Sequence, residues 1–515
     1  MYLTQGLHRA AQQTPDAEMT ACSGRRRTCA EVRDRVARLA GGLRSLGVSA
    51  GDRVAMLALN SDRYHEYLLA VPWADAVLNP VNTRWSPAEI VYSLRDSATT
   101  VLLVDDAFAP MLPVLRAEHP DLRIVVHTGN GPAPEDVIGY EELIAGSAPA
   151  PDVRRGGDAL AGLFYTGGTT GFPKGVMLSH ANLMTSALGL VASGRAFRAG
   201  ARLLHTAPMF HLADLATWGA VLALGGGHVF LPGFDPATVL ATLERERVTD
   251  CLLVPVMIQQ LADHPSVGAH DLSSLRNVLY GASPIPQAVL ERAMRAFPNA
   301  DFVQAYGMTE LAPVATVLGP ADHRDPALSR SAGRAAAHAE LRITDAFGHE
   351  VPPGTVGEIQ VRGGHVMLGY WDKPAETAEA LRDGWMRTGD AGHLDENGYL
   401  FIVDRLKDMI VSGGENVYSS EVENAIARHP AVACCAVIGV PDDEWGERVH
   451  AVVVLRDGAA LGHDELRAHV KTMIAGYKAP RSTEFVESLP VSGTGKVLKR
   501  DLRAAHWEGQ TRQVH

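Results

Sequence analysis

Residues 165–175 read Tyr-Thr-Gly-Gly-Thr-Thr-Gly-Phe-Pro-Lys-Gly, with four glycines, three threonines and one lysine. Glycine allows positive φ angles and a close backbone approach, so successive N–H groups can converge on an anion. Threonine hydroxyls add neutral donors, and a lysine adds a mobile positive charge suited to phosphate. The stretch therefore predicts a phosphate-binding loop made of Thr166, Gly167, Gly168, Thr169, Thr170, Gly171 and Lys174.

Apolar residues directly before this loop predict the strand that carries it. Residues 160–165 read Leu-Ala-Gly-Leu-Phe-Tyr, a run typical of a buried strand. The Walker phosphate loop needs a lysine directly after a glycine, followed by Ser or Thr. Here Lys174 lies three residues after Gly171 and precedes Gly175. A kinase or GTPase of the Walker type is therefore disfavoured, and a surface turn would also explain the loop taken alone.

The composition is that of a globular protein with more than one domain. The chain has 515 residues, 46% of them hydrophobic, and its mean hydropathy is −0.01. Single hydrophobic cores stop growing beyond about 300 residues, so two or more domains are expected. The 47 Lys and Arg against 59 Asp and Glu give a formal net charge of −12. This balance argues against a nucleic-acid partner.

Cysteine usage and the N-terminal sequence favour a cytoplasmic protein. The five cysteines are odd in number and show no C-x-x-C spacing, so neither a disulfide framework nor a cysteine zinc site is expected. Residues 1–21 contain charges and Pro15, and lack the apolar stretch of a signal peptide. No apolar run approaches about 20 residues, so we expect no transmembrane segment.

Strand-like and helix-like segments alternate through the first four-fifths of the chain. This alternation predicts an α/β fold with largely parallel sheets. Gly47 follows one predicted helix at the position of a C-cap glycine. The segments read as strands are 54–59, 101–104, 124–126 and 252–254, and those read as helices are 33–46 and 236–246.

A change of pattern near residues 404–408 marks the expected domain boundary. The sequence Asp-Arg-Leu-Lys-Asp has four charged residues in five, which is typical of a solvated link. Before it, 358–362 and 399–403 read as antiparallel strands. We expect a large domain over residues 1–405 and a small α+β domain over 406–515, in which 420–428 and 464–473 are helices and 432–440 is a strand.

A second motif offers a ligand for a hard cation. Residues 304–310 read Gln-Ala-Tyr-Gly-Met-Thr-Glu. Mg²⁺ takes oxygen ligands, commonly one or two carboxylates together with phosphates. A strand end followed by a helix capped by Thr309 is the alternative reading. Upstream, 279–284 read Leu-Tyr-Gly-Ala-Ser-Pro, a sequence that is also common in turns.

Two further motifs lie toward the C-terminus. Residues 385–390 read Trp-Met-Arg-Thr-Gly-Asp, and Asp390 comes 80 residues after Glu310. An ionised carboxylate only accepts hydrogen bonds, which suits a vicinal diol. Residues 489–500 read Leu-Pro-Val-Ser-Gly-Thr-Gly-Lys-Val-Leu-Lys-Arg. A basic terminal tail would not require the glycines before Lys496.

In this order, the motifs resemble those of the adenylate-forming (AMP-binding) superfamily, which includes acyl-CoA synthetases, luciferases and nonribosomal-peptide adenylation domains. The resemblance spans about residues 28–500. It implies a two-step ligase: a carboxylic acid and ATP form an acyl-adenylate and pyrophosphate, and the CoA thiol then displaces AMP. It also implies a large N-terminal domain of stacked mixed and parallel sheets with a small β-barrel-like part, followed by a mobile α+β lid.

The resemblance assigns roles in nucleotide binding. Tyr306 would stack on adenine, Gly307 beside it would belong to the ATP/AMP site, Thr309 would contact the α-phosphate, and Glu310 would coordinate the Mg²⁺ ion. Lys496 of the lid would bridge the carboxylate and the α-phosphate. The adenine-side loop would comprise Gly281, Ala282 and Ser283, and the ribose hydroxyls would be held by Asp390 and Arg405.

The resemblance also assigns the acyl and CoA sites. Lys407 would be the pivot of the lid, and His211, in the segment Pro-Met-Phe-His-Leu at 208–212, would gate the acyl site. The acyl pocket would include His211, Trp218, Val256, Gly281 and Pro313, which suggests an uncharged tail, as in a medium-chain fatty or aryl-alkyl carboxylic acid. Residues 412–418 would line the pantetheine tunnel, through Gly413, Gly414 and Glu415.

Two positions depart from common patterns of the family. Gly167 stands where many relatives carry Ser, so one hydroxyl donor is lost. Leu212 stands where amino-acid-activating relatives usually carry Asp, which argues against an amino-acid substrate. Alternatives to a CoA ligase are an enzyme that loads a carrier protein, a luciferase-like oxygenase and a non-catalytic nucleotide-binding homologue. Dimers occur in the family, so a homodimer is possible.

Overall fold

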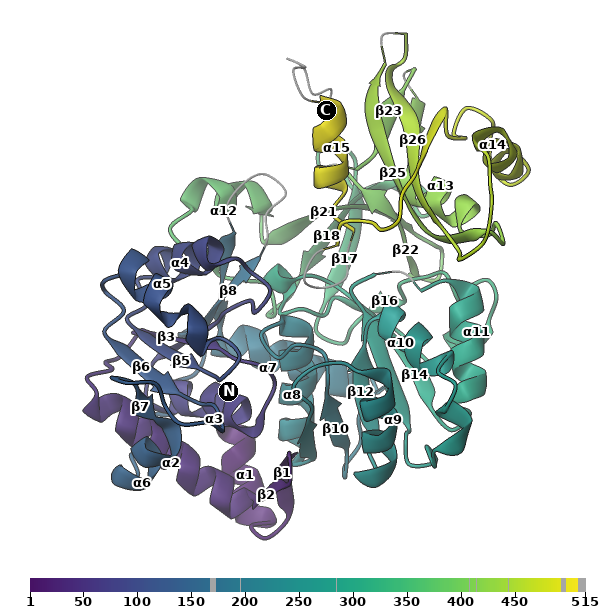
Figure 1. The fold of residues 1–515 in the computed structure, drawn as a ribbon. Helices are drawn as coiled ribbons and strands as arrows, with labels where there is room; N and C mark the ends of the chain where they lie inside the picture. Colours follow the sequence, from purple (N-terminus) through teal and green to yellow (C-terminus); the bar gives the residue numbers. More distant parts are fainter. Residues whose placement is uncertain are drawn as a thin grey trace. The chain divides into compact units, whose positions relative to one another are not determined.

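The computed structural model describes residues 1–166, 173–194, 196–283, 285–406, 408–413, 415–442, 444–491 and 497–507 (Figure 1). Two compact units divide the chain. The first comprises Met1–Glu340 and Val361–Met386, and the second comprises Leu341–Gln360 and the described residues from Arg387 onward. The predicted division into a domain of residues 1–405 and a mobile lid of residues 406–515 stays a prediction.

An eight-stranded sheet in the first unit carries the predicted phosphate loop. The central pairs, such as β3–β4 and β3–β5, are parallel, and β8 pairs antiparallel with β9. The inner strands are buried apolar runs, as expected where helices cover both faces of a parallel sheet. In spatial order the strands are β19 (Gly369–Tyr370), β9 (Lys174–Ser179), β8 (Leu160–Thr166), β4 (Val77–Pro80), β3 (Arg53–Leu57), β5 (Val101–Val104), β6 (Ile124–His127) and β7 (Ile138–Gly139).

A nine-stranded sheet is the second large sheet of the first unit. Its central pairs are parallel, and the pairs at its two ends are antiparallel. In spatial order the strands are β16 (Arg334–Ala335), β15 (Thr316–Leu318), β14 (Asp301–Tyr306), β13 (Asn277–Gly281), β12 (Asp250–Leu253), β10 (Arg202–His205), β11 (Gly227–Phe230), β1 (Glu18–Cys22) and β2 (Arg25–Thr28).

Helices alternate with these strands, so the predicted α/β class is confirmed. Helix α2 begins with a capping box between Thr28 and Glu31 and ends before Gly47, whose φ of 93° is the predicted C-terminal glycine geometry. The helices are α1 (Gln5–Gln13), α2 (Cys29–Ser45), α3 (Asp62–Trp73), α4 (Pro87–Asp96), α5 (Leu112–Glu118), α6 (Tyr140–Gly146), α7 (His180–Ala192), α8 (Leu212–Leu224), α9 (Pro236–Arg245), α10 (Pro255–Ala262), α11 (Gln287–Ala296) and α12 (Pro374–Ala380).

Two five-stranded sheets complete the strand inventory. One runs β17 (Glu340–Thr344), β18 (Gly357–Arg362), β21 (Trp385–Leu394), β20 (Leu381–Arg382), with β22 (Leu400–Arg405) paired to β21. The other runs β24 (Glu415–Val417), β23 (Ile410–Ser412), β26 (Gly446–Leu455), β25 (Val432–Asp442), with β27 (Ser482–Phe485) paired to β26. Helices of the second unit are α13 (Ser419–Ile426), α14 (His463–Lys471) and α15 (Lys499–Trp507).

The charged run at 404–408 predicts a solvated link, and for Asp404 this prediction is wrong. Strand β22 continues through Arg405, and Asp404 is buried. Its carboxylate accepts a hydrogen bond from the hydroxyl of Ser419 at 2.7 Å, which compensates for the loss of hydration. Lys407 lies outside the described residues.

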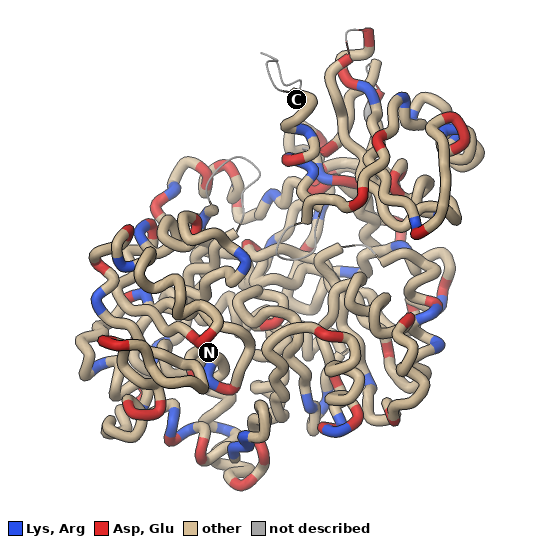
Figure 2. The backbone as a smooth tube through the Cα atoms, in the orientation of Figure 1, with Lys and Arg blue, Asp and Glu red and all other residues tan. Residues whose placement is uncertain are grey.

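Acidic and basic residues are interspersed along the chain (Figure 2). All five cysteines are free thiols. Among the described residues, the structure has no helix that combines the length and the apolar character needed to cross a membrane.

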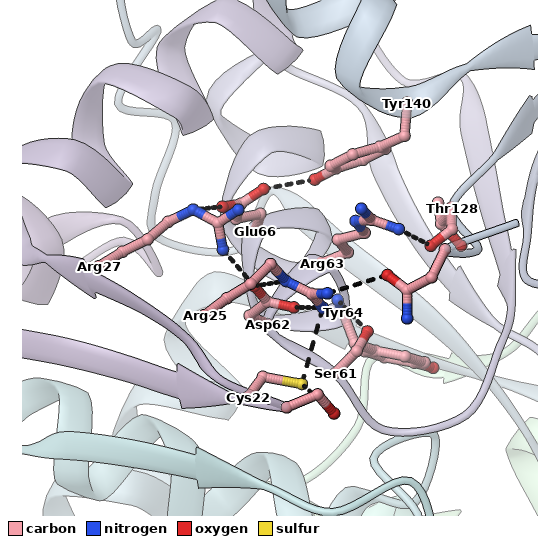
Figure 3. Close-up of polar contacts among 12 residues, drawn as sticks. Cys22, Arg25, Arg27, Ser61, Asp62, Arg63, Tyr64, Glu66, Thr128 and Tyr140 are labelled. Carbon is pink, nitrogen blue, oxygen red and sulfur yellow. Dashed lines mark hydrogen bonds and ion pairs between the residues drawn. The ribbon is translucent and has the colours of Figure 1, made fainter.

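Helix α3 is buried along its whole length although it carries an aspartate, an arginine, a histidine and a glutamate. Arg25 of the β1–β2 hairpin makes two hydrogen bonds to Asp62, at 2.7 and 3.0 Å, and Arg27 pairs with the same carboxylate (Figure 3). Glu66 accepts from Arg35 at 2.6 Å and from the hydroxyl of Tyr140 at 2.7 Å. Buried charges are tolerated where they are paired and hydrogen-bonded in this way.

These contacts make stability depend on the charge of Asp62. Burial alone would raise the pKa of Asp62, but hydrogen bonds and charge from Arg25 and Arg27 outweigh it and lower the pKa from 3.8 to about 2. Because the folded-state pKa lies below the ordinary value, the stabilisation is present above about pH 4. It is lost as the pH falls from there toward 2.

We expect Asp62→Asn to lower the free energy of unfolding at pH 7 by roughly 2 kcal/mol, because it removes the carboxylate paired with Arg25 and one of the carboxylates paired with Arg27. Urea unfolding measured at pH 7 and at pH 3 would test this, and the difference from wild type should shrink at the lower pH. Asp34→Asn is the matched control, since Asp34 pairs with Arg38 on an exposed helix face and should change stability by under about 0.5 kcal/mol. An Asp62 variant as stable as the control would contradict the prediction.

Candidate functional site

The predicted phosphate loop joins two antiparallel strands. Thr166, the last residue of β8, pairs in register with Lys174, the first residue of β9. The strand predicted before the loop is therefore confirmed, and Lys174 begins a strand, whereas the lysine of a Walker loop leads into a helix. The residues between them, Gly167, Gly168, Thr169, Thr170 and Gly171 with Phe172, lie outside the described residues.

Tyr370 contacts both Lys174 and Glu310. The Lys174 ammonium lies 5.1 Å from the centre of the Tyr370 ring, within the range of a cation–π contact. The Tyr370 hydroxyl donates a hydrogen bond to Oε1 of Glu310 at 2.8 Å. Burial and the Glu310 carboxylate both raise the pKa of Tyr370, so its phenol stays protonated and continues to donate. Three side chains that are far apart in sequence are thus gathered in one place.

Glu310 is buried in a short 3-10 helix, Thr309–Leu311, just after β14. The backbone N–H of Met367 donates to its carbonyl oxygen at 2.9 Å. This contact and the hydrogen bond from the Tyr370 hydroxyl fix the position of Glu310. Carboxylate oxygen is the ligand type that Mg²⁺ prefers, so the donor fits the predicted cation.

Sequence reasoning missed Tyr370, because an isolated Gly-Tyr pair gives no periodic or motif signal. Its position follows from pairing of β19 with β9, in which Tyr370 lies opposite Val176. Because Val176 and Lys174 both belong to β9, this pairing brings the Tyr370 ring beside Lys174.

Two segments predicted to bind adenine follow adjacent parallel strands. β13 ends at Gly281 and β14 at Tyr306, and Gly281 lies in register with Ala305. Ligands of open α/β sheets commonly bind beyond the carboxyl ends of such strands. The register places Ala282 and Ser283 at the same end of the sheet as Gly307 and Thr309.

Two glycines in these segments are required by close backbone approach. A Cβ at Gly281 would lie 2.4 Å from the carbonyl oxygen of Ala305, and one at Gly307 would lie 1.8 Å from that of Pro313. Neither distance is compatible with van der Waals contact, and each obstructing atom is backbone. Any larger side chain would therefore displace the strand ends.

Asp390 and Arg405 lie directly opposite each other in the second unit. They are paired in register on β21 and β22, and Nε of Arg405 is 3.4 Å from Oδ1 of Asp390. The Asp390 backbone N–H donates to the hydroxyl of Thr388, which itself donates to the carbonyl of Ile359 at 2.8 Å. The two residues predicted to hold one ribose are therefore neighbours, and the hydrogen bonds of Thr388 hold the strand at Asp390 in place.

The predicted CoA hairpin is described in part. Gly413 follows β23 with a φ of 62°, and a Cβ there would lie 2.4 Å from the Trp445 ring. Glu415 begins β24 and pairs in register with Ser412. Gly414 lies outside the described residues, as does the lid lysine, Lys496.

The predicted acyl-pocket residues have different environments. His211 caps α8 and its ring centre is 4.1 Å from that of Phe210. Trp218 is fully buried and its indole N–H donates to His65 at 2.9 Å, whereas Val256 is 57% exposed. Pro313 is close to Gly307, as described above. The pocket assignment stays a prediction for all five residues, Gly281 included.

A small cavity is lined by the chain neighbours of two of these predicted pocket residues. It has a volume of about 110 Å³, and its lining includes Phe210 and Met257, which adjoin His211 and Val256. Asn60 also lines it; its side chain donates to the carbonyl of Ala207 and accepts from the N–H of Met209, both at 2.8 Å. Asn60 thereby fixes the segment before α8. Nothing in the local sequence around Asn60 predicts this contact.

We expect Gly307→Ala to abolish most nucleotide-dependent activity, because the new methyl group would collide with the Pro313 carbonyl. Substrate-dependent release of pyrophosphate from ATP should fall at least about 100-fold. Gly268→Ala is the matched control, because a Cβ at Gly268 would meet no atom of the described residues within 4 Å and its φ is not in the left-handed region. Activity of Gly307→Ala close to that of the control would contradict the packing argument.

Comparison with known proteins gives consistent results along the chain. A family model described as AMP-binding enzyme matches residues 7–371, and one described as AMP-binding enzyme C-terminal domain matches residues 421–496. A feruloyl-CoA synthase from Amycolatopsis sp is 43% identical over 96% of this chain and 97% of that protein. A fatty acid–[acyl-carrier-protein] ligase, ScoC, from Streptomyces coeruleorubidus is 36% identical over 98% of this chain and 96% of that protein.

The solved structures include an ATP-bound MatB from Rhodopseudomonas palustris, which superposes with a TM-score of 0.89 and 30% sequence identity over 99% of this chain and 100% of that one. The motifs, the fold and these relatives agree. The chain belongs to the AMP-binding enzyme family, and within it to the acyl-CoA synthetase type.

Proposed function

We propose that this ligase converts an aryl-substituted propenoic or related aryl-alkyl carboxylic acid, with ATP, Mg²⁺ and CoA, into an acyl-CoA, AMP and pyrophosphate. The observation that carries the proposal is the 43% identity to a feruloyl-CoA synthase over nearly the whole of both chains. A medium-chain fatty acid is the other substrate class expected from an apolar pocket. We further propose a cytoplasmic location, which the free thiols favour.

In the first half-reaction, a carboxylate oxygen attacks the α-phosphorus of ATP, and the bond to pyrophosphate breaks. The transition state gathers negative charge on phosphate oxygens, so catalysis requires donors and cations placed around them. Thr166 and Lys174 with the intervening loop would bind the phosphates, and Thr309 would donate to the α-phosphate. Lys496 would neutralise the approaching carboxylate and the α-phosphate together.

Glu310 would hold the Mg²⁺ ion. The ion would supply positive charge to the phosphates. The hydrogen bond from Tyr370 keeps the carboxylate oriented, and the contact of the same ring with Lys174 keeps the lysine close to it. Carboxylate oxygen is the ligand type that Mg²⁺ prefers, which supports a role for Glu310 as a ligand.

The nucleoside would be held by residues of both predicted adenine segments and by the Asp390–Arg405 pair. Tyr306 would stack on adenine, flanked by Gly281, Ala282 and Ser283. The Asp390 carboxylate would accept hydrogen bonds from the ribose hydroxyls, since it is acceptor-only.

In the second half-reaction, the CoA sulfur forms a bond to the acyl carbonyl carbon, and the bond from that carbon to AMP breaks. We propose that the lid turns about Lys407, which withdraws Lys496 and brings Gly413, Gly414 and Glu415 to the pantetheine arm. A conformational step of this kind lets one acyl site serve both reactions. His211, beside Phe210, would turn to open the path for the thiol.

A carrier-protein thiol is the second candidate acceptor. It is favoured by the 36% identity to a fatty acid–[acyl-carrier-protein] ligase over nearly the whole of both chains. Both acceptors present the same phosphopantetheine thiol, so the first half-reaction would be identical. The distinction therefore requires a measurement with each acceptor.

We expect pyrophosphate release to be highest with hydroxycinnamic acids in a panel that also holds benzoates, amino acids and short-, medium- and long-chain fatty acids. Thioester formation should require added CoA, and mass spectrometry would identify the product. Turnover confined to aliphatic acids would overturn the aryl assignment. Pyrophosphate release that yields a thioester only with a carrier protein would overturn CoA as the acceptor.

We expect Lys496→Ala to slow acyl-adenylate formation at least 100-fold while ATP binding changes little, because the lysine acts on the reacting groups. Thioester formation from preformed acyl-adenylate and CoA should stay within a few-fold of wild type. Lys471→Ala, at an exposed lysine of α14, is the matched control. Adenylation that is equal in the two variants would contradict the role of Lys496, and a chain inert toward every acid would support the non-catalytic alternative.

A further inference from the structure

In the described part of the second unit, three side chains of metal-binding type converge outside the proposed active site. Ligand atoms of His450, Glu484 and His506 all lie within 4.8 Å of one another. The three residues come from β26, β27 and α15, so the chain brings them together only when the sheet and the C-terminal helix have packed. No motif in the sequence connects them.

Strand geometry explains why two of them share a face. β26 and β27 are parallel, and His450 lies in register with Ser482. Side chains two residues apart point to the same side of a strand, so Glu484 lies on the face that carries Ser482 and His450. The His506 ring, from α15, lies with its centre 4.8 Å from that of His450.

The His450 imidazole has one nitrogen engaged and one unused. Nδ1 is 2.7 Å from the Ser482 hydroxyl, while Nε2 is buried and has no hydrogen-bond partner among the residues that the structure describes. Oε2 of Glu484 lies 3.8 Å from this Nε2 atom. The His450 side chain is only 7% exposed. Buried polar atoms are nearly always satisfied, so this nitrogen, placed beside a histidine and a carboxylate, is positioned to bind a ligand together with them.

Helix α15 is fastened to the second unit independently of this cluster. The Trp507 indole donates to the Gly439 carbonyl at 3.1 Å, Arg503 pairs with Asp408 at 2.9 Å, and Lys499 pairs with Glu423 at 2.8 Å. His506 is therefore held close to His450 by other contacts, so the site is largely preformed.

We propose that His450, Glu484 and His506 bind one divalent transition-metal ion of the Zn²⁺ class, with water in the fourth position. Two imidazoles and a carboxylate match a common zinc donor set, and the hydroxyl of Ser482 on the far nitrogen of His450 is the outer contact that orients such ligands. Ligand atoms around tetrahedral zinc are roughly 3.3 Å apart. Glu484, whose side chain is 54% exposed, is free to move the distance required.

The ion would tie α15 to strands β26 and β27. Helix α15 begins three residues after Lys496, so the metal would anchor the segment that follows the lid lysine. The site takes no part in the proposed chemistry, and its test uses neither ATP nor a carboxylic acid.

The test is a titration of the tag-free, metal-stripped full-length protein with Co²⁺, followed by visible absorption, and then displacement with Zn²⁺. We expect saturation at one equivalent with bands of a four-coordinate ion, and a rise in the unfolding temperature with Zn²⁺. His506→Ala and Glu484→Gln should each weaken binding at least about tenfold and remove the thermal shift.

Matched controls separate a built site from surface binding. Glu487→Gln changes an exposed acid in the same segment, and His349→Ala changes an imidazole with an 80% exposed side chain. Both should bind the metal as wild type does. The proposal is overturned if binding does not saturate, or if the His506 and Glu484 variants bind as tightly as the controls. Because His450 is buried and its replacement could impair folding, the conclusion does not depend on a His450 variant.

Discussion

The burial of helix α3 is the constraint on which the architecture of the first unit depends. Every residue of Asp62–Trp73 is buried, including an aspartate and a glutamate whose charges would be costly without partners. The partners come from elsewhere in the chain: Arg25 and Arg27 from the β1–β2 hairpin and Arg35 from α2. Ion pairing at α3 therefore ties an edge of the nine-stranded sheet to a helix that also packs on the eight-stranded sheet.

The frame built in this way places the reactive residues at strand ends. Lys174 begins a strand of one sheet, and Glu310 follows a strand of the other. Tyr370 contacts both through one aromatic ring and one hydroxyl. The glycines nearby are determined by backbone packing, since Gly281 and Gly307 each face a carbonyl oxygen at a distance that excludes a Cβ. Steric exclusion by these carbonyl oxygens requires glycine at both positions, whether or not the glycines also contact a nucleotide.

In the second unit, the alternation of side chains along the strands decides which polar groups meet. Asp390 and Arg405 face each other across β21 and β22, while Asp404 is turned inward and bonded to Ser419. Adjacent residues of β22 therefore differ in their surroundings: Arg405 pairs with Asp390, whereas Asp404 is buried. The same alternation along β27 places Ser482 and Glu484 on one face, where His450 supplies the unused nitrogen.

Local sequence was sufficient for the α/β class, the strand before residue 166, the helix ending before Gly47 and the family, because apolar periodicity, capping residues and ordered motifs are local signals. It did not predict Tyr370, Asn60, the burial of Asp404 or the His450–Glu484–His506 cluster. Each of these depends on strand register or helix packing between segments distant in the chain, for example 310 with 370 and 450 with 506. The sequence by itself thus determined which chemical groups are present and which local elements carry them, whereas tertiary structure decided which groups meet, because contact between distant segments is set by how the sheets and helices pack.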